Sequence, residues 1–189
     1  MGGVACFWIE PCETVEISLR RYSQKDRGGP CPGRLGYHNA SIVLETAAPR
    51  APDKLYGEHR PPTEEERWDP RWPRLCACGY EFRPDDEWQR NVTRNYRRAD
   101  TGAVFTIADA PAGAMWDATW WPEKTPDGMT LVVRLPDGQD WMIDGEASNG
   151  TPGQPGWSRT GVPPKITARP SIATSKYHGF LTDGVLVSC

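Results

Sequence analysis

The sequence predicts a mainly β fold of the α+β class, and three observations lead to this prediction. The 189 residues include 19 glycines and 19 prolines, which interrupt helices and form turns. Only 38% of the residues are apolar, and several of them alternate with polar residues in short runs. Nine tryptophans supply large apolar rings that each carry one polar group. We therefore expect short antiparallel strands and hairpins within a single domain, residues 1–189.

Two strands are predicted in the N-terminal part of the chain. In the first, Val15, Ile17 and Leu19 alternate with polar residues, which is the period of two of a strand with one solvated face. The β-branched run at 41–45 predicts the second strand. Between the two lies a Gly/Pro-rich turn that contains Cys31.

Residues 47–74 are predicted to form a Pro-rich irregular insertion. Six prolines in this stretch exclude long regular elements, because each removes a backbone donor and restricts the chain before it. One short helix is expected there, since Thr63 followed by Glu66 has the spacing of a capping box.

The main amphipathic helix is predicted over residues 84–98. Pro84 suits the first position of a helix, and the acidic residues after it and the basic residues at the end complement the helix dipole. Trp88, Val92 and Tyr96 recur at intervals of four residues. On a helix these three side chains would form one buried stripe.

The C-terminal half is predicted to contain two hairpins and a long loop. Strands at 129–135 and 139–144 flank a Pro-Asp-Gly turn, in which glycine supplies the positive φ that the turn needs. Residues 145–164 are rich in glycine and proline and are expected to form a loop. The last hairpin pairs 178–181 with 185–187 around a Thr-Asp-Gly turn.

Charge and hydropathy exclude several classes of partner. The net charge is −3 and the pI about 5.7, so no basic field favours nucleic acid. No apolar run approaches the roughly 20 residues that cross a bilayer. The N-terminus lacks the basic leader and long apolar segment of a secretory signal. We expect a protein made in the cytoplasm that has no membrane partner.

The clearest chemical signal is the pair Cys76 and Cys78, with a glycine directly after it. Two thiolates at this spacing can bind one metal ion, and the glycine permits the tight turn of a zinc knuckle. A structural zinc ion needs two further ligands. Cys31 is the first choice because prolines on both sides stiffen its loop, and His38 and Cys12 compete for the fourth position.

Other uses of the cysteines stay open. The six could be buried thiols or could form disulfides with 15 possible pairings, although a reducing cytoplasm disfavours the latter. A catalytic metal is a further alternative, but only three histidines exist and no His-Glu-X-X-His motif is present. The Gly-X-Ser-X-Gly and phosphate-loop motifs are also missing. His178 and Asp144 are the weak catalytic candidates that remain.

The sequence contains several distinctive segments, at 19–22, 31–40, 78–82, 109–116, 126–145, 147–149 and 177–181. They include a Cys-Gly-Tyr sequence at 78–80 and a C-terminal Tyr-His-Gly-Phe-Leu sequence at 177–181. These segments resemble an uncharacterised family of small proteins encoded by phages of actinobacteria, and the resemblance implies a phage origin and a metal knuckle. This chain has one residue between its paired cysteines where the family has two, and residues 150–171 contain neither Cys nor His, which argues against a second metal site.

The leading hypothesis for function is a non-enzymatic phage accessory protein stabilised by a structural zinc ion. It would be part of the virion or would bind protein partners, after synthesis in the host cytoplasm. One alternative is a zinc-dependent hydrolase that acts on a nucleotide or a cell-wall component. The other is a small nucleic-acid-binding zinc protein, which the charge disfavours.

Overall fold

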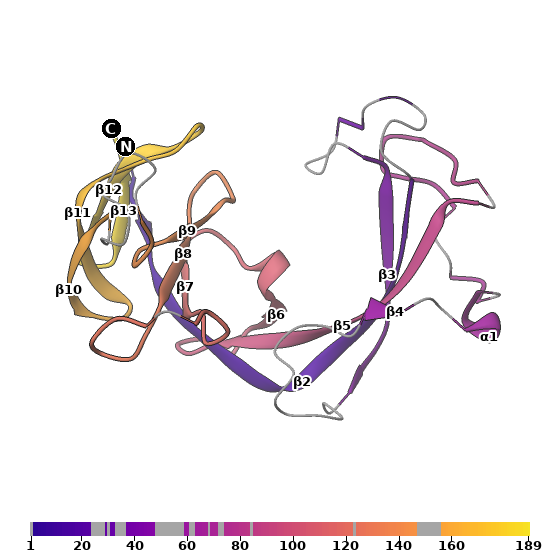
Figure 1. Cartoon of the computed structure of the whole chain (residues 1–189), viewed down its shortest axis with the longest axis horizontal. Helices are drawn as coiled ribbons and strands as arrows, with labels where there is room; N and C mark the ends of the chain where they lie inside the picture. Colours follow the sequence, from indigo (N-terminus) through magenta and orange to yellow (C-terminus); the bar gives the residue numbers. More distant parts are fainter. Residues whose placement is uncertain are drawn as a thin grey trace. The chain divides into compact units, whose positions relative to one another are not determined.

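The computed structural model of the chain is built mainly from β-strands (Figure 1). It describes residues 2–23, 29, 31–32, 37–47, 59–60, 63–67, 69–71, 74–83, 85–122, 124–146 and 156–189. The backbone groups into two compact units: unit 1 comprises residues 1–11 and 96–189, and unit 2 comprises residues 12–95. Two compact units can belong to one folding domain or to two. The single domain expected for residues 1–189 therefore stays a prediction. None of the described helices has the length and apolar character that crossing a membrane requires.

The five-stranded sheet of unit 1 is antiparallel and has the order β1-β13-β12-β11-β10. The predicted C-terminal hairpin is confirmed as β12–β13, and Asp183 and Gly184 in its turn both have positive φ, at 44° and 72°. Part of the predicted loop at 145–164 is instead the edge strand β10, because it pairs with β11. The bounds are β1 (Val4–Ala5), β10 (Ser158–Val162), β11 (Lys165–Ala173), β12 (His178–Thr182) and β13 (Val185–Ser188).

The other strands of unit 1 continue from the start of the long strand β2 (Phe7–Tyr22). Phe7 and Trp8 pair in parallel with β7, and β7, β8 and β9 follow as antiparallel neighbours. The predicted hairpin is confirmed as β8–β9, with Val133 opposite Trp141. The remaining bounds are β6 (Val104–Thr106), the 3₁₀ helix η1 (Ile107–Asp109), β7 (Ala114–Asp117), β8 (Leu131–Arg134) and β9 (Asp140–Met142).

Two apolar clusters form the core of unit 1. They arise because strand alternation places apolar residues of β7, β8, β11 and β12 on inner faces. The first cluster comprises Met115, Leu131, Val133, Leu135, Trp141, Ile143, Ile166, Ala168, Ile172, Tyr177, Leu181 and Leu186. The second comprises Phe7, Ile9, Tyr96, Ala110, Ala114, Trp116, Ala118 and Val132.

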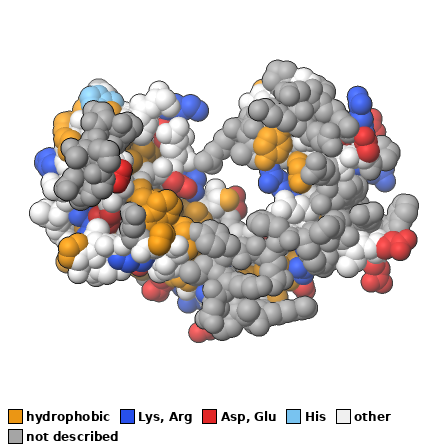
Figure 2. All heavy atoms as spheres, viewed as in Figure 1, with side chains coloured by type: hydrophobic (Ala, Val, Ile, Leu, Met, Phe, Trp, Pro, Cys, Tyr) orange, Lys and Arg blue, Asp and Glu red, His pale blue; other side chains and the backbone are white. Residues whose placement is uncertain are grey.

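Apolar side chains also reach the surface, where they lie among charged ones (orange, blue and red in Figure 2). Phe180 and Val187 are 41% exposed each and face one another across β12 and β13. Single exposed apolar residues are ordinary on protein surfaces. The large apolar side chains with the greatest exposure in the described residues are Val43, Leu75, Val104, Trp121, Val162, Phe180 and Val187.

Unit 2 is built on the second half of β2, which pairs with β3 and neighbours β5. The predicted burial of Val15, Ile17 and Leu19 in β2 is confirmed. The four-residue helix α1 lies at the predicted capping box, while the rest of the 47–74 insertion falls largely outside the described residues. The bounds are β3 (Asn39–Ala47), β4 (His59–Arg60), α1 (Glu64–Arg67) and β5 (Glu87–Arg98).

The predicted amphipathic helix at 84–98 is wrong, because residues 87–98 form strand β5. An interval of four is also a multiple of two, so Trp88, Val92 and Tyr96 share one face of a strand as well as one stripe of a helix. β5 pairs with β4 and β6 and lies beside β2, and these pairings override the helix-like charge pattern. Tyr96 is buried as expected, whereas the Trp88 side chain lies outside the described residues.

Replacing a buried tryptophan tests the packing of unit 1. Trp116 is 2% exposed, so Trp116→Ala should lower the free energy of unfolding by about 3–5 kcal/mol. Trp121→Ala is the matched control and should cause a much smaller loss, because 42% of that residue already faces solvent. Urea denaturation measures both, and equal losses would contradict the packing described for the second cluster.

Candidate metal centre

Four potential metal ligands come from two segments of unit 2. Cys31 lies in the connection between β2 and β3, and His38 directly precedes β3. Cys76 and Cys78 belong to a tight turn further along the chain. Cys76 follows Cys31 by 45 residues. The chain therefore has to fold before the two halves of the donor set can meet.

The turn that carries Cys76 and Cys78 has the backbone of a knuckle. Leu75 and Glu81 form an isolated antiparallel bridge at its base. Inside it the N–H of Cys76 donates to the carbonyl of Tyr80 at 2.9 Å, and the N–H of Gly79 donates to the carbonyl of Cys76 at 2.8 Å. Gly79 has a φ of +90°, a conformation that a residue with a Cβ rarely adopts. The glycine after the second cysteine thus closes the turn, as the sequence predicts.

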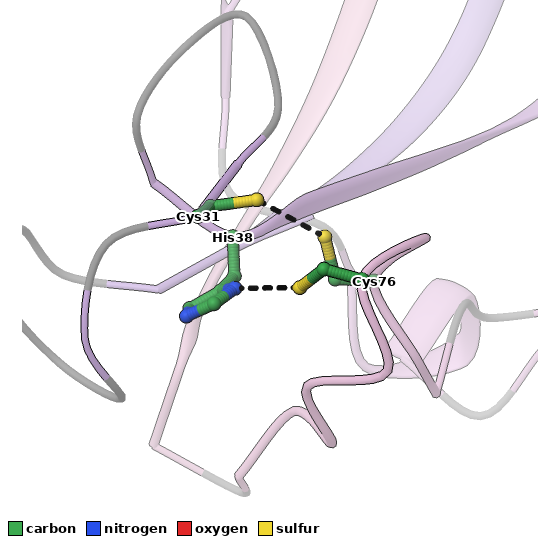
Figure 3. Close-up of side chains that lie close together, drawn as sticks. Cys31, His38 and Cys76 are labelled. Atoms are coloured by element: carbon green, nitrogen blue, oxygen red, sulfur yellow. Dashed lines mark hydrogen bonds between the residues drawn. The ribbon is translucent and has the colours of Figure 1, made fainter.

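The side chains of Cys31, His38 and Cys76 converge (Figure 3), and the side chain of Cys78 completes the group. The Sγ atoms of Cys31 and Cys76 are 3.8 Å apart, and Nδ1 of His38 lies 3.1 Å from Sγ of Cys78. All four ligand atoms lie within 4.8 Å of one another. Zn–S bonds of about 2.3 Å in a tetrahedron separate two sulfurs by about 3.8 Å. The arrangement can therefore hold a metal ion, and it is the only such cluster in the described part of the chain.

Three of the four donors are withdrawn from solvent. Cys31, His38 and Cys76 are buried, and only Cys78 is exposed. Cys31 and Cys76 form a small apolar cluster with Phe82, against which Ala40 and Tyr80 pack. Because thiols behave as small apolar groups, this surrounding fits them even without a metal.

Hydrogen bonding prepares one of the buried thiols for a metal. Burial is the largest influence on Cys76 and raises its pKa. Hydrogen bonds from the backbone N–H groups of Cys78 and Asn39 and from the thiols of Cys78 and Cys31 act against burial and together lower the pKa from 9.0 to about 6. At neutral pH this sulfur is then a thiolate, which is the form that binds a metal.

The structure separates the two residues that compete for the fourth ligand position. His38 lies in the cluster, whereas Cys12 is buried in β2 and does not belong to it. Cys6 and Cys189 are also outside the group. All six cysteines lie in the described residues, and no disulfide joins any two of them. The side chains that could hold a metal ion together are therefore Cys31, His38, Cys76 and Cys78.

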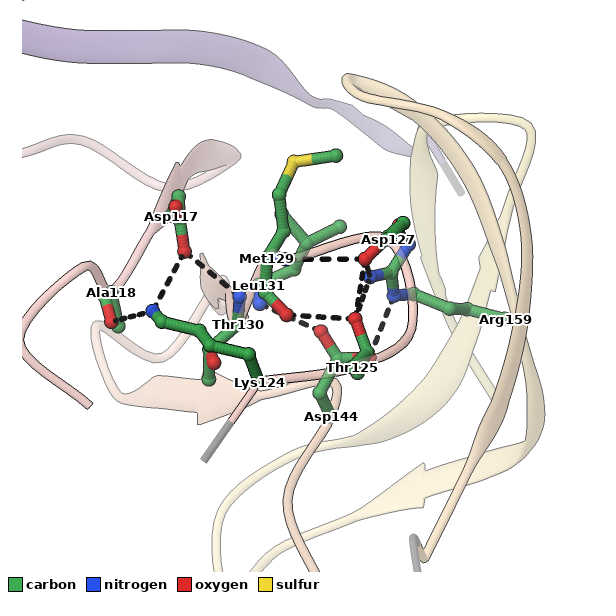
Figure 4. A network of polar contacts seen from close by, with 10 residues as sticks. All are labelled: Asp117, Ala118, Lys124, Thr125, Asp127, Met129, Thr130, Leu131, Asp144 and Arg159. Atoms are coloured by element: carbon green, nitrogen blue, oxygen red, sulfur yellow. Dashed lines mark hydrogen bonds and ion pairs between the residues drawn. The ribbon is translucent and has the colours of Figure 1, made fainter. Parts of the chain in front are cut away.

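Asp144, one of the two weak catalytic candidates, has a structural role (Figure 4). Its Oδ2 accepts the N–H of Leu131 at 2.7 Å, and its Oδ1 accepts Nε of Arg159 at 2.6 Å. Arg159 also pairs with Asp127 at 2.8 Å. Both oxygens of Asp144 are thus used to hold β8 and β10. Nothing in the sequence around Arg159 indicated this pairing.

His178, the other weak candidate, lies on the exposed face of β12. Strand alternation puts His178 and Phe180 on one face of β12, and the apolar Phe180 predicts from the sequence that this face is buried. The structure contradicts this prediction, because the face is exposed. Tyr177, Gly179 and Leu181 occupy the inner face instead. Tyr177 and Leu181 fill the core there and leave the other face to solvent. His178 does not belong to the group of four potential metal ligands.

The lowered pKa of Cys76 predicts a pH dependence for the metal-free protein. Between about pH 6 and pH 9 the unfolded chain holds a proton on this sulfur that the folded chain has lost. The free energy of unfolding should therefore rise with pH across this range and lose this contribution as the pH falls through about 6. Urea denaturation in the presence of a chelator measures it, and Cys76→Ser should flatten the slope. A slope that survives the substitution would refute this origin.

A second prediction concerns the structural role of Asp144. Asp144→Ala leaves the N–H of Leu131 and the side chain of Arg159 without this acceptor, so the free energy of unfolding should fall by about 1–3 kcal/mol. Asp127→Ala removes the other carboxylate of the same arginine. Because 43% of the Asp127 side chain is exposed, it should cost less than about 1 kcal/mol. Thermal denaturation compares the two, and an unchanged stability of Asp144→Ala would contradict the assignment.

Comparison with family models, with curated proteins and with solved structures finds no match to this chain. The interpretation of the metal centre therefore rests on its own chemistry. Three thiols and one imidazole converge from two segments, and the backbone of the knuckle holds two of them in place. The chain thus carries a Cys₃His donor set that can hold a metal ion.

Proposed function

We propose that this protein binds one zinc ion through Cys31, His38, Cys76 and Cys78, and that the ion has a structural role. The observation that carries the proposal is the convergence of four protein ligands within 4.8 Å. Structural zinc sites use four protein ligands, whereas catalytic sites keep one position for water or substrate. A Cys₃His set has no position left for a substrate.

The donor chemistry supports zinc over the other common metals. Magnesium and calcium prefer oxygen ligands, and the cluster contains none. Three thiolates and an imidazole form a soft donor set, and a tetrahedral arrangement of sulfur and nitrogen suits zinc. The metal-free pKa of about 6 for Cys76 also reduces the number of protons that zinc has to displace at neutral pH.

A structural role also follows from what the ion would connect. It would join the segment between β2 and β3 to the knuckle, which are far apart in the sequence. The apolar cluster in this region comprises only Cys31, Cys76 and Phe82 among the described residues. Such a cluster contributes little hydrophobic stabilisation, so metal binding would supply a large part of the folding energy here.

At the level of the whole protein, we propose a non-enzymatic accessory protein that acts through contacts with other proteins. The closed donor set and the structural use of Asp144 support this proposal over a zinc-dependent hydrolase. The resemblance of its sequence segments to phage proteins supports a role in infection, with the virion as one location. Mass spectrometry of purified virions tests that location, because a virion protein would be present at a constant copy number.

Metal analysis tests the structural zinc. Protein purified without chelator should contain about one zinc ion per chain, and chelation should lower its melting temperature. Cys78→Ser should lose most of the zinc and a large part of the stability of unit 2. Cys189→Ser is the matched control, since Cys189 is also exposed but lies outside the cluster. A folded protein without zinc, or equal effects of the two substitutions, would contradict the proposal.

A further inference from the structure

We propose that Tyr80 is the residue that orients His38 toward the zinc ion, and that Asp86 anchors Tyr80 in that position. The inference rests on the proposed zinc site and assigns roles to two residues that do not bind the metal. It is drawn from a ring stack, a buried carboxylate and an imidazole nitrogen that makes no hydrogen bond with any described residue.

The rings of His38 and Tyr80 are stacked face to face. Their centroids are 4.0 Å apart and the ring planes differ by 4°. The backbone of Tyr80 closes the knuckle by accepting the N–H of Cys76. Tyr80 is therefore fixed at the site through its main chain while its ring covers one face of the imidazole. The imidazole of His38 therefore cannot rotate about its Cβ–Cγ bond without losing the stacking contact.

No described residue makes with the imidazole the hydrogen bond that normally orients a histidine ligand. Nδ1 of His38 faces the thiols, which leaves Nε2 as the second nitrogen of the ring. Metal-binding histidines usually donate this second N–H to a carboxylate, a carbonyl or a water. Here Nε2 is buried and makes no hydrogen bond with any described residue. Within the described structure the stack is thus the contact that sets the plane of the ring.

Asp86 holds the phenol ring at its other end. The hydroxyl of Tyr80 donates to Oδ2 of Asp86 at 3.2 Å, and the backbone N–H of Arg83 donates to the same oxygen at 2.7 Å. Asp86 is 1% exposed, so its carboxylate is bound within the protein. A carboxylate buried this deeply requires hydrogen bonds. Tyr80 donates one of them, so its ring is held in place by Asp86.

The anchor is in turn joined to strand β2. The guanidinium of Arg21 donates to the carbonyl of Arg83 and lies 5.4 Å from the ring centre of Phe82. The N–H of Asp86 donates to the same carbonyl of Arg83 at 3.0 Å. The segment that contains Asp86 is therefore fixed to β2, the strand beside the potential metal ligands. Together these contacts give the stack a rigid support.

A double-substitution experiment separates this orienting role from a general structural one. Tyr80→Leu removes the ring, and competition with a chromogenic chelator gives the Kd for zinc. We expect Tyr80→Leu to raise the Kd about 10- to 100-fold, the range found when residues that orient ligands are removed. In a His38→Cys background no imidazole needs orienting, so Tyr80→Leu should leave the Kd unchanged. Phe180→Leu, which removes an exposed aromatic ring of unit 1, should leave it unchanged in the natural background.

The outcomes distinguish the roles clearly. An equal loss of affinity in both backgrounds would show that Tyr80 only supports the fold of the knuckle, and no loss in the natural background would also overturn the inference. If the unaltered protein itself takes up no zinc, the proposed function falls and this inference with it. Should His38→Cys fail to fold, the ¹⁵N shifts of histidine in zinc-loaded protein decide. Tyr80→Leu should then show Nδ1 of His38 released from the metal, and a retained bond would refute the inference.

Tyr80→Phe tests the anchor by itself. This variant keeps the stacked ring and loses only the hydrogen bond to Asp86. The Kd for zinc should then lie between those of the unaltered protein and Tyr80→Leu. A Kd equal to that of the unaltered protein would remove Asp86 from the proposal and leave the ring stack as the orienting contact.

Discussion

In the described part of unit 2, Cys31 and His38 meet Cys76 and Cys78, and the structure next to the knuckle is arranged around this contact. Unit 1 has two apolar clusters, each with at least eight buried residues, and its hairpins connect neighbours in the sequence. The cluster at the cysteines of unit 2 has three buried residues, two of which are themselves potential ligands. Where little apolar surface is buried, a metal ion can replace it as the source of stability.

The residues around the cluster show how the protein adapts to such a centre. The knuckle backbone places two sulfurs, and its hydrogen bonds favour the thiolate of Cys76. A tyrosine ring covers the imidazole, and a buried aspartate and an arginine of β2 support that ring. Each of these groups lies within eight residues of a potential ligand or on strand β2. The geometry of the four potential ligands is thus built into short local segments that a bound metal ion would join.

Several features of the fold could be predicted from the sequence because they depend on local chemistry. The hairpin β8–β9 and the hairpin β12–β13 each have a glycine in the turn, at Gly138 and Gly184, where φ is positive. A conformation of this kind is strained for other residues, so the glycine identifies the turn. The knuckle was predictable for the same reason, since Gly79 follows the cysteine pair. These signals need no information from distant parts of the chain.

The sequence by itself determined the alternating strands, the hairpin turns and the residue types that can bind a metal. Only the tertiary structure decided that residues 87–98 form a strand, because their spacing fits a helix and a strand equally and pairing with β4 and β6 beside β2 settles the choice. It also decided that His38, and not Cys12, lies in the group of potential ligands, and that the carboxylate of Asp144 accepts a hydrogen bond from Arg159. The physical reason is the same in each case: these outcomes depend on which distant segments become neighbours, and periodicity describes only one segment at a time.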